Sequence, residues 1–147
     1  MGNLDVAKTV VDLLEAQRFD QARAMMTDDF SFSGPVPEPI DADGFIGLMQ
    51  ALSAGLPNWS YRARDFRAEG PDRVTCTVTV GGTHTETLSL PPLGVSNLAP
   101  TGIEARNPDE TIHLTVRGDQ IANLHADVPP DGGVAGIVRQ LGVDVPG

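Results

Sequence analysis

The spacing of apolar residues divides the chain into a helical first part and a strand-rich remainder. Apolar residues recur at three- and four-residue intervals over 4–16, over the shorter stretch 21–26 and over 42–54, which predicts three amphipathic helices. Asp41 or Asp43 is suited to cap the third helix, because an aspartate side chain accepts hydrogen bonds from the first free N–H groups of a helix. Three helices are therefore expected before the long strands.

From Asn58 onward the apolar period becomes that of a strand. Alternation is clearest over 73–80, where three valines and Cys76 face one way and threonines the other, so we expect Cys76 to be a small buried hydrophobe. A tight turn at 118–120 joins the last two strands into a hairpin, and a short helix is expected over 134–141. Further strands are predicted at 30–33, 59–66, 83–90, 103–106, 110–117 and 121–127.

The order of these elements indicates an α+β fold with a mostly antiparallel sheet. Helices come first and strands after, without the alternating strand–helix units that build a parallel sheet. The loop over 91–102 is long enough to form a lid or a pocket rim. The 147 residues contain no internal repeat and no linker, so we expect a single domain over 1–147.

Composition narrows the classes of partner. The formal net charge is −10, from 20 acidic and 10 basic residues, which argues against nucleic acid and anionic membranes because both need a basic footprint. The apolar runs are far shorter than the roughly 20 residues of a membrane span. The first residues lack the pattern of a signal peptide, so a cytoplasmic location is expected. Cys76 is the one cysteine, and the three histidines lack a metal-binding spacing, so no disulfide and no metal site are predicted.

The stretch 121–127 carries the most suggestive chemistry. As a strand it places Ile121, Asn123, His125 and Asp127 on one face. An imidazole and a carboxylate two positions apart are suited to proton transfer in a pocket. The alternative is that both are inert, hydrogen-bonded polar residues at a strand end.

Three further polar residues are candidates for the same site. His84 and Glu86 share a predicted strand face with two leucines, which places them either in a pocket or at an exposed strand end. The predicted hairpin brings His113 within reach of the last strand. The alternation of its own strand, however, puts His113 opposite the apolar face and so on the outside of the sheet.

Six short segments follow one another at characteristic spacings across nearly the whole chain. They are Thr27-Asp28-Asp29-Phe30, Gly70-Pro71-Asp72-Arg73-Val74, Gly82-Thr83-His84-Thr85, Pro100-Thr101-Gly102, Gly118-Asp119-Gln120-Ile121 and Arg139-Gln140-Leu141-Gly142. Together with the order of elements, they resemble the nuclear transport factor 2-like superfamily, particularly its SnoaL-like polyketide cyclase branch. The likeness is specific for the fold and much less so for function, because the fold hosts cyclases, isomerases, hydrolases, dehydratases and non-catalytic binders.

The resemblance implies a cone of three N-terminal helices and a curved sheet around one deep, apolar pocket, with a homodimer formed through the outer sheet face. It also implies acid/base catalysis without a metal or organic cofactor, in which Asp127 acts as acid/base with help from His113. The spacing of the last strand adds His125 as a further candidate to assist Asp127. A desolvated carboxylate suits this role because burial raises its pKa towards neutrality. The side chains expected to contact a hydrophobic cyclic substrate are those of His84, Glu86, Trp59, Tyr61, Asn123, Phe32 and Met49.

The chain departs from the SnoaL-like pattern at the last strand. His125 stands where family members commonly carry Trp. The family aspartate usually lies one or two positions beyond Asp127, which makes Asp131 a rival for its role. Ketosteroid-isomerase-like chemistry ranks lower because the sole tyrosine, Tyr61, lies in a different strand from that family's donor.

Limonene-epoxide-hydrolase-like proteins share the fold and use an Arg-x-Asp pair. At the corresponding strand this chain has His84-Thr85-Glu86 in place of the Arg-x-Asp pair. Ser31 and Ser33 replace the Tyr and Asn that this family carries before the proline-rich loop. The hydrolase interpretation is disfavoured but stays open, because His84, Glu86 and Asp127 can together hold a water. Three functions are favoured over it: a cofactor-independent cyclase or isomerase, a non-catalytic binder of a hydrophobic ligand, and a structural dimer with a vestigial pocket. The enzyme interpretation requires Asp127 and at least one histidine to line one enclosed cavity.

Overall fold

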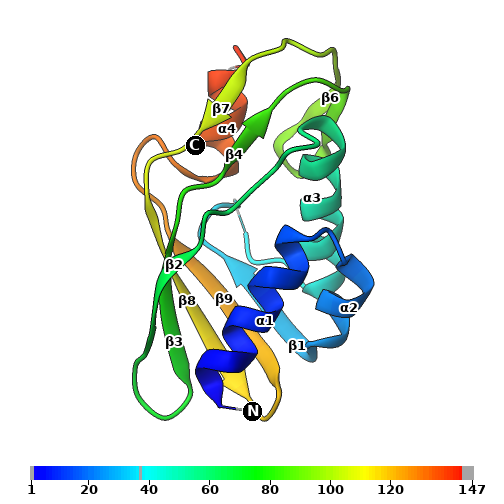
Figure 1. Cartoon of the computed structure of the whole chain (residues 1–147). Helices are drawn as coiled ribbons and strands as arrows, with labels where there is room; N and C mark the ends of the chain where they lie inside the picture. The colour runs from blue at the N-terminus through cyan, green and yellow to red at the C-terminus, as the bar shows by residue number, and fades with distance from the viewer. Residues whose placement is uncertain (1, 37, 144–147) are drawn as a thin grey trace.

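The computed structural model describes residues 2–36 and 38–143 of the chain, without the side chain of Pro92. The four α-helices that the apolar spacing predicts all form (Figure 1). Two of them precede the long strand β1 Met26–Ser33, the third follows it, and the fourth follows the last strand. The α-helices are α1 Asn3–Glu15, α2 Phe19–Ala24, α3 Ala42–Gly55 and α4 Gly133–Gln140. Asp41 is the cap of α3, because its Oδ1 accepts a hydrogen bond of 2.8 Å from the backbone N–H of Gly44.

A curved, mostly antiparallel sheet of five strands forms the centre of the fold, which confirms the α+β class. Only the pair β1–β9 is parallel among these neighbours. In spatial order the strands are β1 Met26–Ser33, β9 Gln120–Asp127, β8 Glu110–Arg117, β3 Arg73–Val78 and β2 Arg64–Ala68. Two small sheets lie beyond it: β4 Gly81–Thr83 with β7 Glu104–Arg106, and β5 Leu88–Leu90 with β6 Val95–Leu98, the latter pair joined through the 3-10 turn η1 Pro91–Leu93.

The main sheet has an apolar inner face and a polar outer face. Helices α1 and α3 lie on the same side of it, and α4 lies beside β7 (Figure 1). Along β8, Ile112, Leu114 and Val116 are buried against the helices, while His113 and Thr115 between them are half-buried on the other face. Burying a leucine such as Leu114 contributes about 1.5–3 kcal/mol. This alternation decides which side chains can enter the interior of the fold.

A β-bulge at Ala122 changes the predicted faces of the last strand. Thr115 pairs with Asn123 but Val116 pairs with Ile121, so Ala122 is the extra residue. Ile121 is therefore buried on the side of the core, whereas Asn123 faces outward. The prediction that Ile121 shares a face with Asn123, His125 and Asp127 is wrong, because one inserted residue shifts the period of two by one position.

Several predicted strand boundaries are also wrong. The segment over 59–63 is irregular and β2 begins at Arg64, because Arg62 has a φ of 47° that an extended strand does not allow. The predicted strand over 83–90 is divided into β4 and β5. Residues 27–29 extend β1 and do not end a helix. None of the helices in the described ranges is long and apolar enough to cross a membrane.

Candidate functional site

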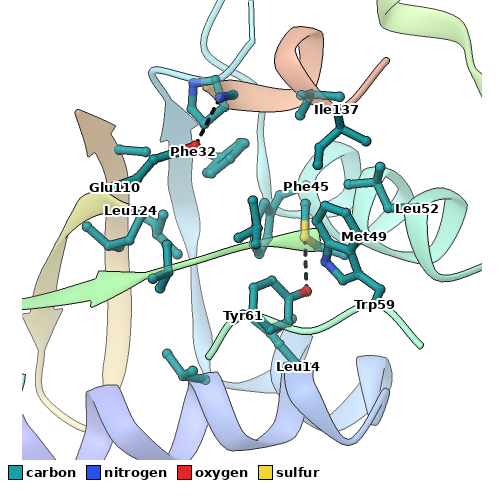
Figure 2. Close-up of a pocket in the computed structure, with 18 of the residues that line it drawn as sticks. Leu14, Phe32, Phe45, Met49, Leu52, Trp59, Tyr61, Glu110, Leu124 and Ile137 are labelled. Atoms are coloured by element: carbon teal, nitrogen blue, oxygen red, sulfur yellow. Dashed lines mark hydrogen bonds between the residues drawn. The ribbon is translucent and has the colours of Figure 1, made fainter. Parts of the chain in front are cut away.

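The helices and the inner face of the sheet enclose an apolar cavity of about 80 Å³. Its walls come from α1, α3 and α4 and from strands β1, β3, β8 and β9. Figure 2 shows Glu110 and Leu124 on one side of the cavity and Tyr61, Met49 and Trp59 on the other. Side chains far apart in the sequence therefore meet around one apolar space.

The cavity is small for a cyclic ligand. A dry protein cavity that binds benzene has about 150 Å³, roughly twice the space found here. Met49 lies in the wall, and its unbranched thioether side chain changes rotamer more readily than a leucine or a phenylalanine. A ring-sized ligand is therefore expected to displace the Met49 side chain as it enters.

Glu110 supplies the carboxylate of this apolar cavity. It is the first residue of β8 and only 4% exposed. Its Oε2 accepts hydrogen bonds from the Gly133 backbone N–H at 3.0 Å and from Asn107 Nδ2 at 3.3 Å. No described residue donates a hydrogen bond to Oε1. The free oxygen can bind a ligand hydrogen.

The surroundings of Glu110 explain its protonation behaviour. Burial raises the pKa of the carboxyl group above its ordinary value, and the bonds from Gly133 and Asn107 partly oppose the rise. Gly132 permits this close approach, because a Cβ there would lie 2.9 Å from Oε2 and 2.7 Å from Pro129. A carboxyl with a raised pKa in an apolar site is suited to exchange protons with a ligand.

Two hydrogen-bond donors lie on the other side of the cavity. The Tyr61 hydroxyl donates to the Met49 sulfur at 3.2 Å (Figure 2), and a thioether sulfur is a weak acceptor. Burial raises the pKa of Tyr61 far above its ordinary value, so the hydroxyl keeps its proton. The Trp59 ring meets Tyr61 edge-on, with centroids 6.2 Å apart, and its buried indole N–H lacks a well-aligned acceptor among the described residues. The indole N–H interacts with the Tyr61 oxygen, which partly opposes the rise in the pKa of Tyr61. A ligand oxygen would replace the Met49 sulfur and the Tyr61 oxygen as the acceptors of these two hydrogens.

The other wall residues supply no positive charge. Among the described residues that line the cavity there is no Lys, Arg or His. Cys76 is in the wall, and burial raises the pKa of its thiol to about 11, which leaves it protonated and a poor nucleophile. No group of three metal-ligating side chains able to hold an ion is found in the described ranges. Proton transfer is the chemistry that Glu110 itself can supply in this cavity.

Four of the seven residues expected to contact a substrate line the cavity. They are Phe32, Met49, Trp59 and Tyr61, and their contact with a substrate stays a prediction. The other three lie elsewhere. His84 is fully buried outside the cavity wall with Nδ1 bonded to Thr101, Glu86 is exposed, and Asn123 bonds Ser31 on the outer face.

The predicted acid/base residues lie on the outer face of the sheet. His113 Nε2 lies 2.7 Å from Asp127 Oδ2, and His125 Nε2 lies 3.5 Å from Asp127 Oδ1. The Asp127 side chain is 59% exposed, and its hydrogen bond with His113 lowers the pKa of the carboxyl. The expectation that Asp127 would be buried in the cavity with a raised pKa is wrong. Neither Asp127 nor a histidine is among the described residues that line the cavity, so the condition set for an enzyme that uses Asp127 is not met. Asp131 is exposed too.

The alternation of β8 and β9 is the reason for this placement. His113 alternates with Ile112 and Leu114, so it faces outward, as the alternation of its own strand predicts. His125 and Asp127 alternate with the buried Ala126, so their side chains lie on the outer face together with His113. A catalytic role for these three residues stays a prediction, as does a homodimer through this face.

Glu110 is the functional candidate missing from the sequence predictions. A usable signal was present, because Glu110 has the same period-two phase as the buried Ile112, Leu114 and Val116 of β8. A carboxylate on the apolar face of a strand is rarely buried without a partner.

The raised pKa of Glu110 predicts how stability depends on pH. The folded chain binds the Glu110 proton more tightly than the unfolded chain, for which the ordinary pKa is about 4.3. The contribution of Glu110 to the free energy of unfolding is thus most favourable below that pKa and is lost as pH rises through the raised value. Urea unfolding at pH 4 and pH 8 measures the free energy of unfolding of the wild type and of Glu110→Gln. Raising the pH to 8 should lower the stability of the wild type relative to that of the variant. A difference that is constant or moves the other way contradicts this.

Comparisons with known proteins agree with this architecture. The model of the SnoaL-like domain family matches residues 7–124. IdmH, a proposed polyketide cyclase from Streptomyces antibioticus, has a TM-score of 0.70 at 18% identity, covering 97% of this chain and 100% of that one. AclR, a proposed hydroxylase from Streptomyces galilaeus, has a TM-score of 0.72 at 16% identity, with coverage of 98% and 84%.

A SnoaL-like polyketide cyclase from Agrobacterium tumefaciens C58 has a TM-score of 0.67 at 16% identity, covering 96% of this chain and 98% of that one. No curated protein matches the sequence. At these identities the solved structures are evidence for the fold alone.

Proposed function

Because the chain belongs to the SnoaL-like domain family, we propose that it is an acid/base enzyme of the cyclase or isomerase type that works without a metal or organic cofactor. Its substrate is a neutral, apolar, cyclic carbonyl compound bound in the cavity. The observation that carries the proposal is Glu110, a buried carboxyl with a raised pKa and a free Oε1 in an apolar wall.

The proposed reaction is proton transfer next to a carbonyl group. Glu110 takes a proton from a carbon adjacent to the carbonyl, and the electron pair of that C–H bond passes to the carbonyl oxygen as an enolate. The Tyr61 hydroxyl and the Trp59 indole N–H are the donors that stabilise this oxygen. If the substrate carries a C=C bond next to that carbon, the enolate is a dienolate, and Glu110 returns the proton at the γ-carbon, which moves the double bond and is isomerisation. Alternatively, the enolate carbon attacks a second carbonyl of the substrate and closes a ring, and the new alkoxide takes the proton from Glu110.

The charge of the cavity supports a neutral ligand. Glu110 is the carboxylate in the wall, and no lysine, arginine or histidine of the described residues lines the cavity to pair with a ligand anion. Moving an unpaired charge into an apolar site costs several kcal/mol. A free carboxylate, a phosphate or a sulfate is therefore a poor ligand.

Ligand binding can be measured with Trp59, which is the sole tryptophan and lines the cavity. We expect the Trp59 emission to change as methyl cyclohexanecarboxylate is added and to reach a plateau when the cavity is saturated. Cyclohexanecarboxylate at pH 8 should bind at least about 10-fold more weakly, a difference in binding free energy of about 1.4 kcal/mol. The two compounds share the ring and differ in charge. N-acetyltryptophanamide controls for quenching in solution.

The matched variant is Glu110→Gln. It should reduce the difference in affinity between methyl cyclohexanecarboxylate and cyclohexanecarboxylate, because it removes the carboxylate that repels the charged ligand. Equal affinities in the wild type would contradict the neutral-ligand part of the proposal. A saturating response combined with no proton transfer would favour the non-catalytic binder.

A further inference from the structure

We propose that Ser33, His125 and Asp127 form a second, nucleophilic site on the outer face of the sheet, at which Ser33 is acylated by small esters. This site lies outside the cavity and does not depend on the function proposed for it. Its residues come from β1 and β9, which are neighbouring strands of the sheet. Ser33 and His125 are 92 positions apart in the sequence.

The pair Ser33–His125 has the geometry of a nucleophile and its base. Ser33 Oγ lies 2.8 Å from His125 Nδ1, within the range of about 2.6–3.2 Å for such pairs. The two residues are register partners in the parallel pair β1–β9, so the backbone fixes their separation. With the Nε2–H tautomer, Nδ1 accepts the serine proton.

Asp127 is placed to orient the imidazole. Its Oδ1 lies 3.5 Å from His125 Nε2, longer than a hydrogen bond and typical of a pair that tightens when substrate binds. Its Oδ2 accepts a hydrogen bond of 2.7 Å from His113 Nε2, which fixes the carboxylate from the other side. The hydrogen bond also lowers the pKa of Asp127. The carboxylate is thus held in the charged form that stabilises an imidazolium.

An open groove borders this cluster on the side of His125 and Asp127. His125 and Asp127 lie in its wall together with Gly34, Thr111, Val128 and Pro129. Ser33 is half-buried directly before Gly34, at the end of β1. The groove is shallow and mostly polar, so it suits a short acyl group and differs from the apolar cavity behind the sheet.

The chemical step balances without a further reactant except water. Ser33 Oγ attacks the ester carbonyl carbon, and its proton passes to His125 Nδ1. The tetrahedral intermediate then expels the leaving group and leaves Ser33 as an ester. An alkoxide takes the proton from His125, whereas p-nitrophenolate leaves as the anion and His125 releases its proton to solvent water, so that His125 is neutral again in either case. Water, deprotonated by His125, attacks this ester and releases the carboxylic acid together with free Ser33.

Two probes test the proposal directly. A fluorophosphonate should form an adduct with Ser33 Oγ, located by peptide mass spectrometry, and p-nitrophenyl acetate should give a burst of up to one p-nitrophenolate per chain. This ester is suitable because its leaving group departs readily and lowers the demand for oxyanion stabilisation. Both are measured over a dilution series, so that association through the outer face is detected as a concentration dependence.

Matched variants separate the nucleophile from its neighbours. Ser33→Ala should abolish adduct and burst, and His125→Gln should slow labelling by about 10²-fold. Ser31→Ala is the control, since Ser31 lies on the same strand face and bonds Asn123. Asp127→Asn should lower the labelling rate and change its pH profile, as expected of a positioning residue. Circular dichroism confirms folding of each variant. No adduct at Ser33 at any dilution, or labelling that survives His125→Gln unchanged, would overturn the proposal.

Discussion

Glu110→Gln is expected to slow the exchange of α-hydrogens of cyclohexanone for deuterium by at least about 10²-fold, because general acid/base catalysis by a positioned side chain typically contributes 10²–10⁴-fold. The glutamine has the shape of the glutamate, and its carbonyl oxygen can still accept the bond from the Gly133 N–H. It cannot take up a proton. The rate is followed by proton NMR in D₂O, which needs no knowledge of the natural substrate.

Binding and chemistry can be separated in the same experiment. Glu110→Gln should still bind methyl cyclohexanecarboxylate, as reported by Trp59 emission, since the wall of the cavity is otherwise unchanged. Tyr61→Phe is the matched variant for the donor side and should lower the exchange rate by less, about 10-fold, because Trp59 remains as a donor. Unaltered exchange in Glu110→Gln would remove Glu110 from the mechanism.

Gly34→Ala is expected to lower the free energy of unfolding by about 3 kcal/mol. Gly34 has a φ of 105°, which residues with a Cβ rarely adopt. An added Cβ would also overlap the backbone carbonyl oxygen of Ala126 on β9, and neither backbone can yield without disturbing the β1–β9 pair. Urea denaturation with a two-state fit measures the change.

The control for this variant is Gly70→Ala. Gly70 also has a positive φ, 81°, but nothing lies within 4 Å of an added Cβ. Gly70→Ala should lower the free energy of unfolding by about 1 kcal/mol, which is the penalty of the left-handed backbone conformation alone. Equal losses in the two variants would mean that the close approach to Ala126 contributes nothing to stability.

The apolar spacing predicted the fold well because each element buries a continuous stripe. In α1 the buried residues Val6, Val10 and Leu14 recur at helical spacing, and in β8 the period of two holds without interruption from Glu110 to Arg117. Predictions failed where backbone geometry breaks the period. The bulge at Ala122 and the positive φ of Arg62 are set by tertiary packing, and local spacing carries no trace of either.

The candidate site was predicted in part. Trp59 and Tyr61 were expected to face a substrate and do line the cavity, although they lie outside the strand assigned to them. Asp127 was predicted from the spacing of the last strand and from the family resemblance, and neither fixes whether that face of the strand points into the cavity or outward. The burial of Glu110 could be predicted from the alternation of β8. Its hydrogen-bond partner Gly133 could not, because the two residues are far apart in the sequence and meet only in the folded chain.

The exchange experiment with cyclohexanone tests the location of the acid/base group most directly when Glu110→Gln and Asp127→Asn are measured side by side. The two substitutions are chemically equivalent, but one removes the carboxylate in the cavity and the other the carboxylate on the outer face. A site at Glu110 predicts a loss of at least about 10²-fold for Glu110→Gln and a rate near wild type for Asp127→Asn. A rate near wild type for Glu110→Gln, with the loss in Asp127→Asn, would contradict it.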